Sequence, residues 1–145
     1  MSDPIGVRLN NPCCLEHRHG DPSVLYRGEI HSSDPVYRQF CDAPHGFRAT
    51  VELLRAYYRR DGVRTVREAI ERFSPPSDGN PTALYAANVA DACKLDMDAP
   101  ADFEALWFPM LTAMSNQECG HGWFTGAQIS LGIDLAGPAE VSHET

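Results

Sequence analysis

Residues 44–73 read PHGFRATVELLRAYYRRDGVRTVREAIERF, and this stretch decides the fold class. Its apolar residues recur at intervals of three or four, which places them on one face of a helix that ends near Asp61–Gly62: Phe47, Val51, Leu54 and Tyr58. Thr65 and Glu68 then have the spacing of a capping box, which predicts a second helix over residues 66–73. Two consecutive amphipathic helices indicate a domain built mainly from helices.

Three more helices are predicted further along the chain. The first begins at Asn80–Pro81, read as an N-cap followed by the first helical residue, and runs to about residue 94. The next covers about residues 102–118, with a kink expected at Pro109. A weaker capping box opens a short last helix, residues 125–132.

Residues 1–43 lack apolar periodicity and are rich in Asn, Pro, Gly, His and Asp. They predict an irregular lobe with two or three short strands. We therefore expect one mainly α (α+β) domain of about five helices. It consists of this irregular/β lobe, a helical lobe at residues 44–136 and a frayed tail at residues 137–145.

Charge and composition exclude several function classes. The 145 residues hold 12 Lys and Arg against 20 Asp and Glu, a net charge of −8. This balance argues against nucleic acid or an anionic membrane surface as a partner. The apolar runs are too short to span a bilayer, so no membrane insertion is expected. No P-loop, GxGxxG, HExxH or GxSxG motif is present, and no cofactor is predicted.

Residues 1–4 have neither a basic nor an apolar character, so we expect no secretory signal. The five cysteines are odd in number and follow no CxxC spacing, which is typical of thiols kept reduced in a cytoplasm. A protein of this kind would be made in the cytoplasm. It would act in the periplasm or cell wall only after delivery by another machine, or as part of a virion.

Residues 13–19, with Cys119 and His121, contain ligand types that suit zinc. Their spacing is poor, because adjacent cysteines rarely both reach one ion. A polar loop with two buried thiols is the preferred interpretation, and no metal site is predicted. A nucleophilic pair of Cys119 and a histidine has no support beyond the residue types.

Glu118 falls where an apolar helix ends against a glycine-rich turn, residues 119–122. The negative end of the helix dipole and a nearby aromatic ring, Trp123 or Phe124, would both raise the pKa of this carboxyl. A general acid near neutral pH needs such a pKa. The alternative is a solvated glutamate at a frayed helix end.

Five stretches, in the same order along the chain, resemble a family of phage and prophage proteins that begin with GIRNNNPGNIR. The matching stretches start at GVRLNNP and lie at residues 6–12, 37–49, 54–70, 73–85 and 118–133. Members of that family are described as virion structural proteins or as lysozyme-like proteins that degrade peptidoglycan. The resemblance covers nearly the whole chain, about residues 6–136.

The resemblance implies a lysozyme-like fold and a muramidase or lytic transglycosylase acting on bacterial peptidoglycan. Lysozyme-like enzymes place their catalytic glutamate before an Asn-Asn loop, whereas here the loop comes first, as in a circular permutation. Glu118 would then face Asn10 and Asn11 across a groove and protonate the glycosidic oxygen. Glu29 and Asp78 are the candidates for a second catalytic carboxylate. Sugar hydroxyls could be bonded by Asn10, Asn11 and Asn80. The aromatic rings that could stack on sugar rings are Tyr26, Tyr85 and Trp123.

Two alternatives remain open from the sequence. One is a non-catalytic virion or secretion-associated protein with a structural or cell-wall-binding role, and other virion or secretion-machine proteins as partners. The other is a peptidoglycan peptidase, which would need a metal or thiol site in residues 13–19.

Overall fold

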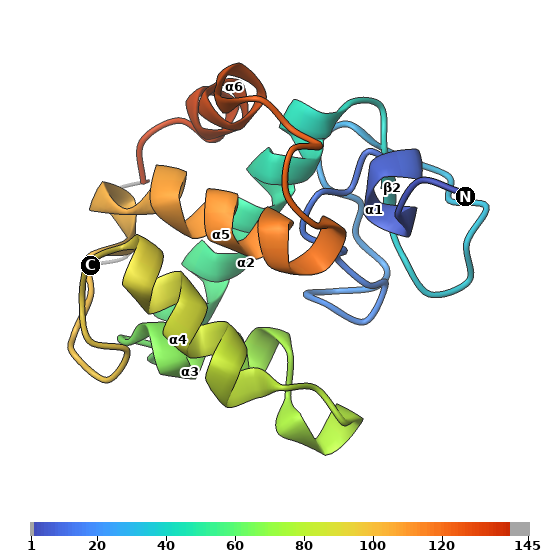
Figure 1. The fold of residues 1–145 in the computed structure, drawn as a ribbon. Helices are drawn as coiled ribbons and strands as arrows, with labels where there is room; N and C mark the ends of the chain where they lie inside the picture. The colour runs from blue at the N-terminus through green and yellow to red at the C-terminus, as the bar shows by residue number, and fades with distance from the viewer. Residues whose placement is uncertain (1, 140–145) are drawn as a thin grey trace.

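The computed structural model describes residues 2–139, which form six α-helices and one two-stranded sheet. α2 (Ala43–Asp61) lies at the centre of the molecule, and α6 (Gly126–Ala136) packs along it. α5 (Trp107–Cys119) runs across α2 (Figure 1). The three helices share a core to which α2 contributes most of one face, including Phe47, which no solvent reaches.

α3 (Val66–Phe73) packs on α4 (Thr82–Ala92), and α4 packs in turn on α5. The two helices lie on the opposite side of α5 from α6 (Figure 1). The fold is therefore mainly helical with a small sheet, as the sequence predicted. No helix within residues 2–139 is long and apolar enough to cross a membrane. The tail expected at residues 137–145 lies outside the described residues from residue 140 onward.

Local sequence signals set several helix ends. Both predicted capping boxes are present, at Thr65 with Glu68 and at Thr125 with Gln128. α2 ends at Gly62, whose φ of 71° is left-handed and suits glycine. These ends depend on residues close together in sequence, which is why the pattern predicted them.

Two helix starts differ from the prediction. The helix expected from residue 102 is divided into a short 3₁₀ turn, η2 (Phe103–Ala105), and α5 from Trp107. Pro109 therefore falls in the first turn of α5, where its missing N–H has no helical partner to lose, rather than at a mid-helix kink. α4 begins at Thr82, and Asn80 does not cap it: its amide donates to the carbonyl of Pro75 at 3.1 Å.

The last helix is longer than predicted, because Gly132 does not end it. α6 continues to Ala136, and Gly132 is buried where α6 crosses α2. A Cβ at this position would lie 2.5 Å from the Cβ of Phe47 and 2.8 Å from the carbonyl oxygen of Pro44. The glycine is thus used for close helix packing and not for a turn.

The N-terminal lobe contains more helix than expected. A single turn, α1 (Ile5–Arg8), precedes an antiparallel pair of two-residue strands, β1 (Glu29–Ile30) and β2 (Gln39–Phe40). An isolated bridge joins Glu16 to Tyr37. The predicted short strands are present, whereas α1 was not predicted.

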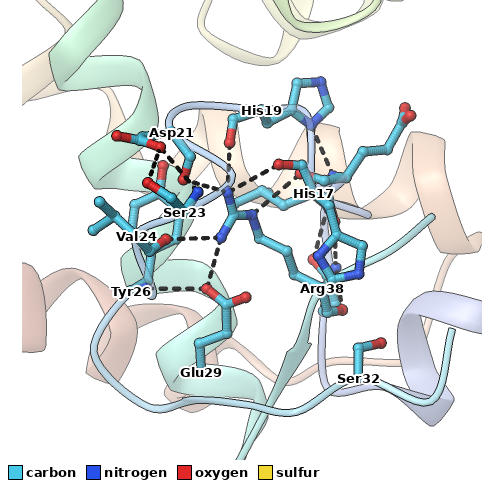
Figure 2. Close-up of polar contacts among 12 residues, drawn as sticks. His17, His19, Asp21, Ser23, Val24, Tyr26, Glu29, Ser32 and Arg38 are labelled. Atoms are coloured by element: carbon cyan, nitrogen blue, oxygen red, sulfur yellow. Dashed lines mark hydrogen bonds and ion pairs between the residues drawn. The ribbon is translucent and has the colours of Figure 1, made fainter. Parts of the chain in front are cut away.

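A buried arginine organises this lobe. The guanidinium of Arg38 pairs with Glu29 at 2.8 Å, and the two side chains are 1% and 2% exposed. Figure 2 shows the same guanidinium surrounded by backbone carbonyls of the preceding loop. It donates to the carbonyl oxygens of Glu16, His17, His19, Asp21 and Val24. The loop at residues 16–24 therefore takes its shape from one side chain with five donors in a planar fork.

Candidate active site

Glu118 lies in the last turn of α5 and lines a pocket of about 80 Å³. The other lining residues come from the loop before β1, the residue two positions before β2, the end of α3 and the segment between α3 and α4: Cys14, Glu16, Arg18, His19, Tyr37, Phe73, Ser74 and Asn80. The pocket thus lies where the N-terminal lobe meets the helices. The carboxyl of Glu118 is half-buried there rather than free in solvent.

The environment of Glu118 favours its protonated form. Burial raises the pKa of its carboxyl from 4.5 to about 7, and the negative charge of Glu16 adds to the increase, while the hydroxyl of Tyr85 opposes it. The C-terminal end of α5 also disfavours an anion. A carboxyl with this pKa can donate a proton near neutral pH.

The second carboxylate in the pocket is Glu16, which sequence reasoning had considered only as a neighbour of possible metal ligands. Its backbone pairs with Tyr37 in the isolated bridge, and its side chain accepts from Arg18 at 2.8 Å. Glu16 could have been found only from its place in three dimensions, since 102 residues separate it from Glu118 along the chain.

Neither predicted partner carboxylate lines the pocket. Glu29 is buried in its ion pair with Arg38, so its position argues against the catalytic role predicted for it. Asp78 does not line the pocket, but its carboxylate accepts a hydrogen bond at 2.9 Å from Arg18, which does. Glu29 is thus held by Arg38 inside the lobe, and Asp78 lies in the segment between α3 and α4.

The Asn-Asn loop lies beside the end of α5, but its side chains do not face a groove. Asn11 is fully buried and bonds the backbone of Leu15 and Arg38. Asn10, with a φ of 53°, donates to the carbonyl of Phe40. Both amides are used to hold the lobe together, which argues against the sugar-binding roles predicted for them. The residue after the loop, Pro12, contacts α5 instead: its carbonyl oxygen accepts a hydrogen bond from the thiol of Cys119 at 3.4 Å.

The remaining predicted residues are divided between the pocket and the surface. Asn80 lines the pocket. Tyr85 is 2% exposed. Its hydroxyl lies near enough to Glu118 to lower the pKa of that carboxyl, although among the described residues it has no hydrogen-bond partner of good geometry. Tyr26 packs under the guanidinium of Arg38, 5.1 Å from its ring centroid. Trp123 is 43% exposed on the turn after α5. Neither Tyr26 nor Trp123 lines the Glu118 pocket, and Phe124, the other ring expected near Glu118, does not line it either.

His19 holds part of the pocket wall in place. Its Nδ1 accepts from the backbone N–H of Glu16, and its Nε2 lies 2.8 Å from the carbonyl of Phe73. Because one nitrogen must accept and the other must donate, the ring is neutral with the proton on Nε2. Burial lowers the pKa of His19, which agrees with that state. Both ring nitrogens are thus engaged with backbone, so His19 is a positioning residue.

A larger cavity of about 700 Å³ adjoins the pocket and shares Arg18 and His19 with it. Its other lining residues come from the loop after His19 and from α2 and α3, including Tyr57, Arg60, Glu71 and Arg72. A drug-sized or sugar-sized ligand fits a cavity of this volume. The small pocket and the larger cavity therefore meet at Arg18 and His19.

The chain matches no protein-family model. It is 28% identical over 131 residues to Protein P5 of Pseudoalteromonas phage PM2, and the alignment covers 89% of this chain and 79% of that protein. The chain is thus similar to a phage protein.

Proposed function

We propose that this protein cleaves the glycan strands of bacterial peptidoglycan, with Glu118 as general acid. One observation carries the proposal: a half-buried carboxyl with a pKa of about 7 lines a pocket that also holds a second carboxylate. Glycoside cleavage uses this combination, because the carboxyl with the raised pKa protonates the leaving oxygen.

In the proposed reaction Glu118 transfers its proton to the glycosidic oxygen as the bond from that oxygen to the anomeric carbon breaks. The carboxylate of Glu16 stabilises the positive charge that develops on the sugar ring. A hydrolase then adds water to the anomeric carbon, and the proton that the water loses returns to the carboxylate of Glu118. A lytic transglycosylase instead uses a hydroxyl of the same sugar, and that path needs no second carboxylate.

Arg18 controls access in this proposal. A pocket of about 80 Å³ is smaller than a typical ligand site of roughly 300 Å³ or more, so the strand would lie in the adjoining cavity. Arg18 borders both cavities and pairs with Glu16 and Asp78. Its side chain is 47% exposed, and exposed ion pairs contribute only about 0–1 kcal/mol, so a bound strand can displace it.

The test is to incubate the purified chain with peptidoglycan and to analyse the released fragments by mass. Fragments with anhydro-sugar ends would identify a transglycosylase, and reducing ends would identify a hydrolase. Glu118→Gln is expected to release none, while Asp91→Asn, which changes an exposed carboxylate on α4, is expected to retain full release. Equal release by the Glu118→Gln variant would refute the proposal, and free stem peptides would indicate a peptidase instead.

A second candidate is a non-catalytic phage structural or wall-binding protein. The small volume of the Glu118 pocket favours it, together with the similarity to a phage protein. In that case the chain would sediment with peptidoglycan and release no fragments from it.

A further inference from the structure

Three ligand-type side chains converge at the junction of β2 and α2, away from the Glu118 pocket. The Sγ of Cys41, a carboxylate oxygen of Asp42 and a ring nitrogen of His45 all lie within 4.8 Å of one another. The Nδ1 of His45 is 3.5 Å from the Sγ of Cys41 and 2.7 Å from the Oδ1 of Asp42. We propose that Cys41, Asp42 and His45 bind a zinc-type divalent cation.

The distances suit a tetrahedral ion. With Zn–S and Zn–N bonds of about 2.3 and 2.05 Å, a tetrahedral angle places sulfur and nitrogen about 3.5 Å apart. The Sγ and Nδ1 atoms already have this separation. The carboxylate must move outward by roughly 0.7 Å to reach its own tetrahedral distance. The side chain of Asp42 is 52% exposed, so it has room to do so.

A nucleophilic relay does not explain the arrangement. In such a relay one imidazole nitrogen faces the thiol and the other faces the carboxylate. Here the same atom, Nδ1, contacts both groups, so the three ligand atoms form one cluster within 4.8 Å. Convergence on one point is the geometry of a metal site. A thiolate and a carboxylate also offset the partial positive charge at the start of α2.

The backbone holds these side chains in place. Cys41 follows β2 and donates its N–H to the carbonyl of Gly28 at 2.8 Å. Asp42 caps α2 by accepting from the N–H of His45 at 2.9 Å. The ring of His45 lies against Gly28, where a Cβ would come within 2.4 Å of it. Preorganised donors lose little freedom on binding. The bound ion would tie the strand end to the first turn of the helix, with water as its fourth ligand.

The test is a titration of the full chain with Co²⁺, whose thiolate charge-transfer absorption reports a cysteine ligand. The wild type is expected to bind one Co²⁺ with this absorption, and Zn²⁺ is expected to displace it. Cys41→Ser should abolish the absorption. Asp42→Asn should weaken affinity at least about tenfold while keeping a good N-cap, so misfolding would not explain the loss. Cys93→Ser, which removes a buried thiol at the end of α4, should change nothing.

Absence of the thiolate absorption in the wild type, or its persistence in Cys41→Ser, would overturn the proposal. So would an unchanged Co²⁺ affinity in Asp42→Asn. Zn²⁺ should also raise the melting temperature of the wild type and leave that of Cys41→Ser unchanged, because only a bound ion stabilises the folded state. None of these readouts depends on Glu118 or on activity toward peptidoglycan.

Discussion

Replacing Glu118 by Gln should stabilise the fold, and the gain should depend on pH. The folded-state pKa of about 7 lies above the ordinary value of 4.5. Between these two values the folded chain holds a proton that the unfolded chain has released. Stability is therefore lost as the pH rises through this interval, while below it Glu118 imposes no cost.

The size of the effect follows from the pKa difference. At about 1.36 kcal/mol per pKa unit, an ionised Glu118 costs the folded state about 3 kcal/mol at pH 8 and less than about 1 kcal/mol at pH 5. The neutral amide of Gln avoids this cost. We therefore expect Glu118→Gln to raise the free energy of unfolding by about 3 kcal/mol at the higher pH and to have little effect at the lower one.

Urea unfolding of both chains at the two pH values measures this difference. Glu71→Gln is the control, because Glu71 is exposed on α3, and its change should stay within about 0.5 kcal/mol at both pH values. An effect of Glu118→Gln that is equal at both pH values would show that Glu118 ionises like a solvated carboxylate, and the reasoning would be wrong.

Three further substitutions test other parts of the account. Gly132→Ala should lower the free energy of unfolding by about 1–3 kcal/mol, because its Cβ would overlap Phe47. Gly126→Ala, in the first turn of α6, should leave the stability unchanged or raise it, and thermal unfolding of the two variants measures the difference. Arg38→Lys should cost about 3 kcal/mol in urea unfolding, since an ammonium cannot satisfy the acceptors around the guanidinium, and a loss below about 1 kcal/mol would contradict this. Tyr85→Phe removes the hydroxyl that lowers the pKa of Glu118, so the pH profile of fragment release should shift to higher pH, and a shift to lower pH would contradict the assignment.

The parts of the fold that the sequence predicted are those set by nearby residues. Thr65 with Glu68 forms its capping box regardless of what packs around it. Gly132 was predicted to end a helix because glycine commonly does so. In the structure its missing side chain instead lets α6 pack closely on α2. That contact joins segments far apart in sequence, so no local pattern could indicate it.

In the candidate site, too, the sequence predicted only what nearby residues determine. Glu118 could be singled out because the end of an apolar helix and a glycine turn are visible in the sequence. Glu16 could not, because it reaches the pocket only after the loop has folded around Arg38. Asn11 appeared suited to sugar binding, but its amide is fully used inside the lobe.

The most direct test of the central claim is an NMR titration of the Glu118 side-chain carboxyl, assigned by the loss of its signal in Glu118→Gln. The expected midpoint is near pH 7, because burial beside Glu16 raises the pKa of this carboxyl to about 7. A midpoint near the ordinary value of 4.5 would contradict it, because a carboxyl that ionises there has no proton to give at neutral pH.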